Sequence, residues 1–102
     1  MAIQCNYYDL WFESFKLSST AGHKLPIQLR LESGQELPHE ISSICEARGV
    51  DPFQLLTRCN TDYQIKYPAG TKFLLEAKVT DRKGGGIFFD APYNWDAKEI
   101  MK

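Results

Sequence analysis

The sequence has few of the residues that build metal centres, disulfide frameworks and membrane spans. It contains two histidines and three cysteines, and none of them stands in a CxxC or HxxxH spacing. Because zinc sites and small secreted scaffolds depend on such spacings or on paired cysteines, we expect no metal ligands, no cofactor and a reducing cytoplasmic setting. The chain begins without a signal-like segment, and its longest aliphatic or aromatic runs, such as residues 73–75, are too short to cross a bilayer. The sequence therefore predicts a soluble protein with no membrane attachment.

A strong net charge of either sign is also missing. Twelve Lys and Arg residues stand against thirteen Asp and Glu residues, which gives a formal net charge of −1. The chain as a whole thus lacks the positive field that drives non-specific binding to nucleic acids. The charges are unevenly spread, because residues 1–47 hold three basic and six acidic side chains whereas residues 48–83 hold seven basic and four acidic ones. This asymmetry is compatible with one local basic face.

The length and composition predict one folded domain over residues 1–102. A chain of this size can bury roughly 60 to 65% of the surface that it exposes when unfolded. The sequence is 43% apolar and 13% aromatic, which is typical of an ordinary packed core and not of a disordered segment. We see no internal repeat, linker or low-complexity segment that would divide it.

Alternation of apolar and polar residues predicts strands in the first third of the chain. Residues 2–8 alternate as a strand would, and residues 9–16 fit either a continuation of that strand or a helical turn. Residues 25–32 have the most regular alternation. Their core-facing side chains are expected to be Leu25, Ile27, Leu29 and Leu31.

The middle of the chain carries the start and stop signals of two short helices. Pro38 suits a first helical position, and Gly49 can adopt the left-handed conformation that closes a helix. Asp51 and Pro52 then form a second N-terminal cap, with apolar residues at helical spacing up to Cys59. Two helices joined at a glycine resemble a helix-turn-helix, but the second one offers few basic side chains. We therefore expect both helices to cover a sheet.

The last third contains the clearest pattern, a β-hairpin. Residues 72–80 alternate strictly, residues 81–86 form a glycine-rich loop, and residues 87–90 form the returning arm. The expected core face of the first arm consists of Phe73, Leu75, Ala77 and Val79.

These elements together predict an α+β fold. Residues 60–67 add a strand with alternating tyrosines, and residues 96–102 fit a frayed helical turn. The expected architecture is an antiparallel sheet of about five strands, flat or curled towards a small barrel. The two short helices are inserted after the second strand and cover one face.

Two binding surfaces follow from the hairpin. Aromatic side chains beside an edge-forming arm are typical of protein interfaces, so self-association or binding of another protein through Phe88, Tyr93 and Trp95 is the first hypothesis. The alternative is single-stranded nucleic acid, because outward-phase cations near an aromatic ring can hold phosphates and stack bases. The cations in question are Lys66, Lys72, Lys78, Arg82 and Lys83.

Catalysis has little support in the sequence. His23 and His39 lie in an expected loop and an expected first helical turn, and Cys45 and Cys59 fall on apolar phases typical of buried residues. A carboxylate pair among Asp9, Glu13, Asp90 and Asp96 would have to be shown by geometry. We predict no catalytic residue, with a small-ligand protein or motif-less enzyme as the third alternative.

Overall fold

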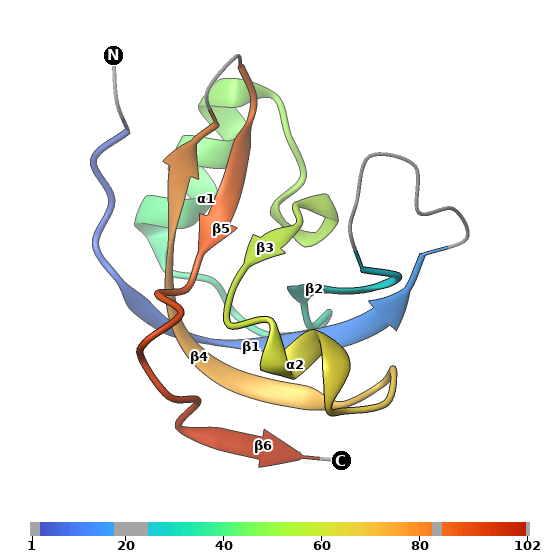
Figure 1. Ribbon diagram of the computed structural model, residues 1–102. Helices are drawn as coiled ribbons and strands as arrows, with labels where there is room; N and C mark the ends of the chain where they lie inside the picture. Colours follow the sequence, from blue (N-terminus) through green and yellow to red (C-terminus); the bar gives the residue numbers. More distant parts are fainter. Residues whose placement is uncertain (1–2, 18–24, 83–84, 102) are drawn as a thin grey trace.

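The computed structural model describes residues 3–17, 25–82 and 85–101, and it has an α+β architecture (Figure 1). A six-stranded sheet dominates it, and the helical segments are short. The strands are β1 (Tyr8–Lys16), β2 (Ile27–Leu31), β3 (Thr57–Arg58), β4 (Lys72–Asp81), β5 (Ile87–Asp90) and β6 (Glu99–Met101). The helical segments are α1 (His39–Arg48), the 3₁₀ turn η1 (Pro52–Gln54) and α2 (Asp62–Ile65).

The sheet is mixed and nearly closed into a barrel. Its strand order is β2-β1-β4-β5-β3, and β6 pairs with the first part of β4. All pairs are antiparallel except β3 with β5, which is parallel, so the expectation of a purely antiparallel sheet was wrong. The two end strands, β2 and β3, contact each other, and the side chain of Gln64 donates a hydrogen bond of 3.0 Å to Ile27 O of β2. Of the two alternatives left open by the sequence, a flat or a curled sheet, the structure has the curled one.

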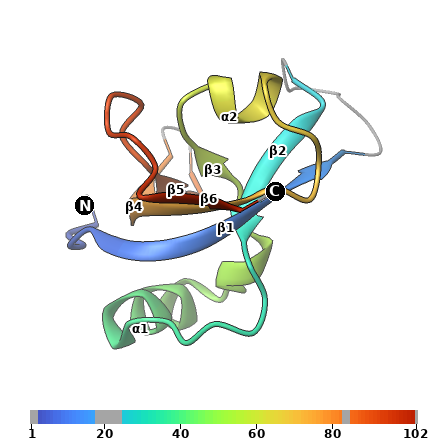
Figure 2. The ribbon, with the colours of Figure 1, turned by 90° about the horizontal axis from the view of Figure 1, so that it is seen from below.

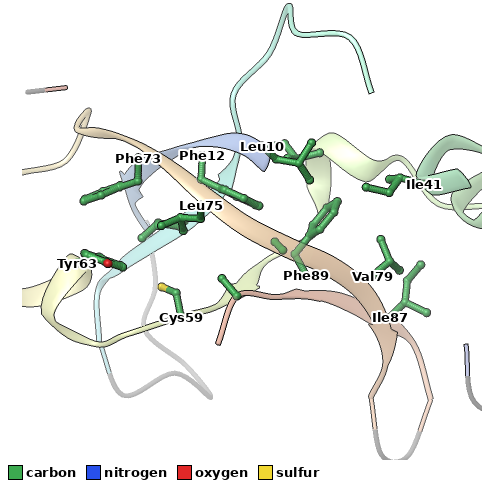
Figure 3. Packing of buried hydrophobic residues seen from close by; sticks show 14 of the residues in the cluster. Leu10, Phe12, Ile41, Cys59, Tyr63, Phe73, Leu75, Val79, Ile87 and Phe89 are labelled. Atoms are coloured by element: carbon green, nitrogen blue, oxygen red, sulfur yellow. The ribbon is translucent and has the colours of Figure 1, made fainter. Parts of the chain in front are cut away.

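The core lies inside this curled sheet (Figure 3). Strand β4 alternates over its whole length, and its inner residues, as predicted, are the buried Phe73, Leu75, Ala77 and Val79. Phe12 of β1 meets Phe89 of β5 edge to face, with ring centroids 5.6 Å apart. Complete burial of each such ring stabilises the fold by about 1.5–3 kcal/mol relative to an exposed ring. Leu29 and Leu31 of β2 are also buried, as their alternation predicted.

Helix α1 begins and ends near its predicted signals. Its buried residues are Ile41 and Cys45, at the four-residue spacing of one helical face. Gly49 follows with φ of +69°, the left-handed conformation that an L-residue adopts only at a cost. Val50 N–H then donates to Cys45 O at 3.0 Å, so the predicted closure at Gly49 is confirmed.

The second predicted helix is only one 3₁₀ turn. Asp51 caps η1 as expected, since its Oδ1 accepts a hydrogen bond from Phe53 N–H at 2.9 Å. The chain becomes extended at Leu55 and enters β3, which is parallel to β5. The structure therefore contains no helix-turn-helix within residues 39–58. In Figure 2, α1 and α2 lie on opposite sides of the long strands β1 and β4, so the helices do not cover one common face.

Residues 60–67 contain helix α2 and not the predicted strand. Asn60 Oδ1 accepts a hydrogen bond from Asp62 N–H at 2.9 Å, which starts the turn. Tyr63 is then buried against Phe73, with ring centroids 4.8 Å apart, and its hydroxyl accepts a hydrogen bond from Ala97 N–H at 2.8 Å. These tertiary contacts stabilise the helical turn, and Tyr63 is the buried residue that α2 presents to the core.

The first strand begins later than predicted. Residues 3–7 lie outside the sheet and are held by side chains: Ile3 N–H donates to Asp81 at 2.7 Å, and Asn6 N–H donates to Glu40 at 2.8 Å. We call residues 3–7 the N-terminal strap. Residues 9–16, for which the sequence allowed either a strand or a helical turn, belong to strand β1. Its inner residues pack into the core.

The tail forms a strand where a helical turn was expected. Residues of β6 pair with Lys72, Phe73 and Leu74 of β4. Just before β6, Lys98 N–H donates to Leu74 O at 2.8 Å, and its ammonium lies 3.0 Å from Asp9 and 3.2 Å from Glu76. Backbone pairing and these ion pairs hold the tail against the sheet.

Candidate binding surface

Phe88 of β5 is the centre of a basic cluster on the outer side of the sheet. The residue is 9% exposed, and two guanidinium groups lie over its ring. The Cζ atom of Arg58 lies 5.1 Å from the ring centroid, and that of Arg82 lies 5.3 Å from it. We call Arg58, Arg82 and Phe88 the arginine cluster. Cation–π contacts of this kind fix the long side chains and leave the edges of the guanidinium groups free to donate hydrogen bonds.

Strand register lines up three charges beside this cluster. Asp90 of β5 is opposite Lys78 of β4 on one side and opposite Arg58 of β3 on the other. Arg58 Nε donates to Asp90 Oδ1 at 3.0 Å, and this hydrogen bond raises the pKa of the arginine above its ordinary value. Asp90 therefore neutralises Arg58 and fixes its direction.

A hollow of about 690 Å³ lies against the arginine cluster. We call it the outer hollow. Strands β3, β4 and β5 contribute charged and hydroxyl side chains to it, and the segment around α2 contributes Thr61 and Gln64. Its volume is in the range of roughly 300–1,000 Å³ that is usual for small-molecule sites.

Exposed aromatic side chains gather next to the cluster. Tyr7 lies against Trp95, with ring centroids 4.9 Å apart, and the ammonium of Lys78 lies 5.0 Å from the centroid of Tyr7. Tyr93 is 76% exposed and Trp95 is 43% exposed. Tyr7, Arg58 and Tyr93 line a second hollow of about 550 Å³. We call Tyr7, Tyr93 and Trp95 the aromatic surface.

The predicted binding residues are thus only partly brought together. Lys78, Arg82 and Phe88 line the outer hollow, while Tyr93 and Trp95 belong to the neighbouring aromatic surface. Phe88 differs from the expectation in two respects: it is covered, and its strand β5 lies between β4 and β3 and not at a sheet edge.

The other predicted cations do not join this site. Lys66 pairs with Asp62 of its own helix at 3.4 Å. Lys72 pairs with Glu32 at 2.6 Å, and it precedes Lys78 by six residues, or about 20 Å along an extended strand. Lys83 lies outside the described residues. The structure therefore does not bring Lys66 and Lys72 together with Lys78 and Arg82.

Two members of the site were missed from sequence. Arg58 was expected on a packing helix, and Tyr7 was expected within a strand over residues 2–8, with no binding role. The parallel pairing of β3 with β5 places Arg58 on the outer side, and the strap places Tyr7 beside Lys78 and Trp95. No local signal marks either residue, because both positions depend on contacts with distant segments.

The three cysteines and His39 show no arrangement typical of catalytic groups among the described residues. Burial raises the pKa of Cys59 to about 12 and raises the pKa of Cys5 and Cys45, so these thiols stay protonated near neutral pH. His39 lies 3.1 Å from Ser43 one helical turn away. His23 lies outside the described residues.

Two of the four acidic residues considered for catalysis are paired with cations. Asp9 lies against Lys98, and Asp90 accepts from Arg58. Across residues 3–17, 25–82 and 85–101, no group of three or more His, Cys, Asp or Glu side chains is arranged to hold a metal ion. Among the helices of these same ranges, none has the length and apolar character needed to span a bilayer.

Comparison with protein-family models, with curated proteins and with solved structures gives no significant match for this chain. Its function must therefore be inferred from the chemistry of the arginine cluster, the outer hollow and the aromatic surface.

Proposed function

We propose that this protein is a non-enzymatic interaction module that associates with a second copy of itself through the aromatic surface. The supporting observation is the clustering of Tyr7, Tyr93 and Trp95, which are half of the six large hydrophobic side chains that are exposed in the described chain. Tyr, Trp and Arg are the residues that contribute most to binding energy at protein interfaces. Arg58 lies beside these rings, so the surface contains all three of these residue types.

A second copy fits this surface better than a strongly charged partner does. The surface carries both signs, because Arg58 and Asp90 lie side by side, and a twofold contact can set the arginine of one copy near the aspartate of the other. The chain has a net charge of only −1, so long-range repulsion between copies is small.

The test is the particle mass in solution, measured by light scattering over a wide concentration range. The wild type is expected to approach the dimer mass, and the double variant Tyr93→Ser with Trp95→Ser is expected to shift towards the monomer. Ile65→Ser is the matched control, because Ile65 is 64% exposed but belongs to α2, away from the aromatic surface. A wild type that remains monomeric at every accessible concentration would refute self-association. Phe88→Ala is unsuitable here, because the ring is buried.

Single-stranded nucleic acid is the second candidate, and the arginine cluster favours it. Arg58, Arg82 and Lys78 are all held against aromatic rings within one part of the surface, and Tyr93 and Trp95 offer exposed rings for bases. Fluorescence anisotropy with a labelled oligonucleotide should then show binding that weakens with salt and with Lys78→Glu. Lys66→Glu, remote from the cluster, is the control. Absence of binding at low salt rejects this candidate.

A further inference from the structure

We infer that the outer hollow binds the oxyanion group of a small anionic ligand, a phosphoryl or carboxylate group, through Arg82 and Lys78. This site goes beyond self-association, since the ligand would contact the outer hollow and not Tyr93 or Trp95. The first observation is the charge inventory of the hollow. Of its three cations, Arg58 pairs with Asp90, whereas Arg82 and Lys78 have no carboxylate partner within the described residues.

The second acid of the hollow is already engaged elsewhere. Asp81 accepts hydrogen bonds from Arg48 at 2.8 Å and from Ile3 N–H at 2.7 Å. Burial alone would raise the pKa of Asp81, but these two donors outweigh it and the pKa lies below its ordinary value. The carboxylate of Asp81 therefore already accepts hydrogen bonds from Arg48 and Ile3, and it forms no ion pair with Arg82 or Lys78. Arg82 and Lys78 keep their donor capacity for a ligand.

Both cations are held in place by aromatic rings. Arg82 lies over Phe88, which is itself buried, and Lys78 lies over Tyr7. A guanidinium group that stacks through its face still presents in-plane N–H groups, which match the two oxygens of a phosphoryl or carboxylate group. Since these side chains are positioned before binding, less conformational entropy is lost when a ligand arrives.

Neutral polar groups complete the lining. Thr80 is opposite Phe88 in the β4–β5 pair and lines the same hollow, and Gln64 and Thr61 border it from the segment around α2. Hydroxyl and amide groups can donate to the remaining oxygens of a tetrahedral or planar anion. Two cations without carboxylate partners and several neutral donors can therefore contact the oxygens of one oxyanion group together.

The experiment is a titration of the full chain at constant ionic strength with inorganic phosphate and, separately, with malonate, followed by NMR signals of backbone amides and arginine Nε–H groups. We expect saturable shifts at Arg82 and Lys78. Arg82→Gln should weaken binding at least tenfold, and Arg82→Lys should weaken it less, because charge remains while the two-pronged geometry is lost. Tighter binding of phosphate indicates a phosphoryl ligand, and tighter binding of malonate a carboxylate ligand.

Two controls make the result decisive. Lys72→Gln removes a cation that pairs with Glu32 outside the hollow, so it should leave the titration unchanged. The single variant Tyr93→Ser should also bind the anion normally, because Tyr93 does not line the outer hollow, and this separates the site from the proposed self-association. Shifts that do not saturate, or that survive Arg82→Gln, or that Lys72→Gln reduces equally, would overturn the inference. The amide spectrum of each variant also reports whether the fold is intact.

Discussion

Strand β4 has two faces that follow the same alternation but are covered by very different parts of the molecule. Its inner side chains, from Phe73 to Val79, are at most 2% exposed and lie in the core. Its outer side chains are half-buried, and three of them meet three different segments: Lys72 meets Glu32 after β2, Glu76 meets Lys98 before β6, and Lys78 meets Tyr7 of the strap.

The two faces differ in how far the environment of their side chains can be predicted from sequence. An apolar side chain on the inner face is stabilised by removal from water, whichever apolar neighbours it finds, so its position follows from hydrophobic alternation. A charged side chain on the outer face gains little from a surface ion pair, and its partner depends on where distant segments end. The inner face is therefore predictable from sequence, and the outer face is not.

The largest expected effect is on the inner face. Phe73→Ala should lower the free energy of unfolding by about 3–5 kcal/mol, because it leaves a cavity beneath Tyr63 and Tyr67. Leu74→Ala, the next residue along β4 but on the half-buried outer face, is the matched control and should cost much less. Urea unfolding monitored by circular dichroism measures both values. Equal losses would mean that the two faces do not differ in packing.

A smaller effect is expected from overfilling the same inner face. Ala77 is completely buried opposite Tyr8, so Ala77→Leu should cost about 1–3 kcal/mol through displaced neighbours. Lys78→Met, one residue further on the outer face, should change the free energy of unfolding by no more than about 0.5 kcal/mol. Thermal unfolding of the two variants compares them directly. A tolerated Ala77→Leu would reveal unfilled space in the core.

The smallest effect is local and depends on pH. The hydrogen bonds from Asn6 N–H and the Tyr8 hydroxyl lower the pKa of Glu40, and the pKa of Asp81 is also lowered. Acids with a depressed folded-state pKa stabilise the strap above their unfolded-state pKa, and this contribution is lost as the pH falls through about 4 and below. Amide exchange at Ile3 and Asn6 should therefore show weaker protection in acid than amides of β4 do.

Glu40→Gln provides the corresponding variant. It should weaken protection at Asn6 near neutral pH, because an uncharged amide is a poorer acceptor than a carboxylate. Protection of the β4 amides should remain at its wild-type level. Strap amides that keep full protection from neutral pH down to pH 3 would contradict the role of both acids.

Much of the fold could be predicted because the relevant signals are local. Gly49 adopts a positive φ, Asp51 caps the turn that follows it, and the β4–β5 hairpin forms around a glycine-rich loop. Each of these depends on the conformational preference of a few adjacent residues. The same holds for the alternating inner face of β4, which spans enough residues to establish its period.

The failures share a different physical cause. Residues 60–67 alternate over too few positions for the period to separate a strand from a helical turn, and contacts of Tyr63 with Phe73 and Ala97 decide for the helix. Residues 3–7 also alternate, yet the carboxylates of Glu40 and Asp81 hold them outside the sheet. In both segments, tertiary contacts outweigh a short local pattern.

By itself the sequence determined the inner face of β4, the returning arm of β5, the left-handed stop of α1 and the presence of cations and aromatic rings in the second half of the chain. Burial from water and local backbone preference suffice for those features. Only the tertiary structure decided which cations meet which rings. Arg58 reaches Phe88 through the parallel β3–β5 pairing, and Lys72 is drawn to Glu32 instead. Such long-range placement depends on how the whole sheet closes, and no local pattern encodes it.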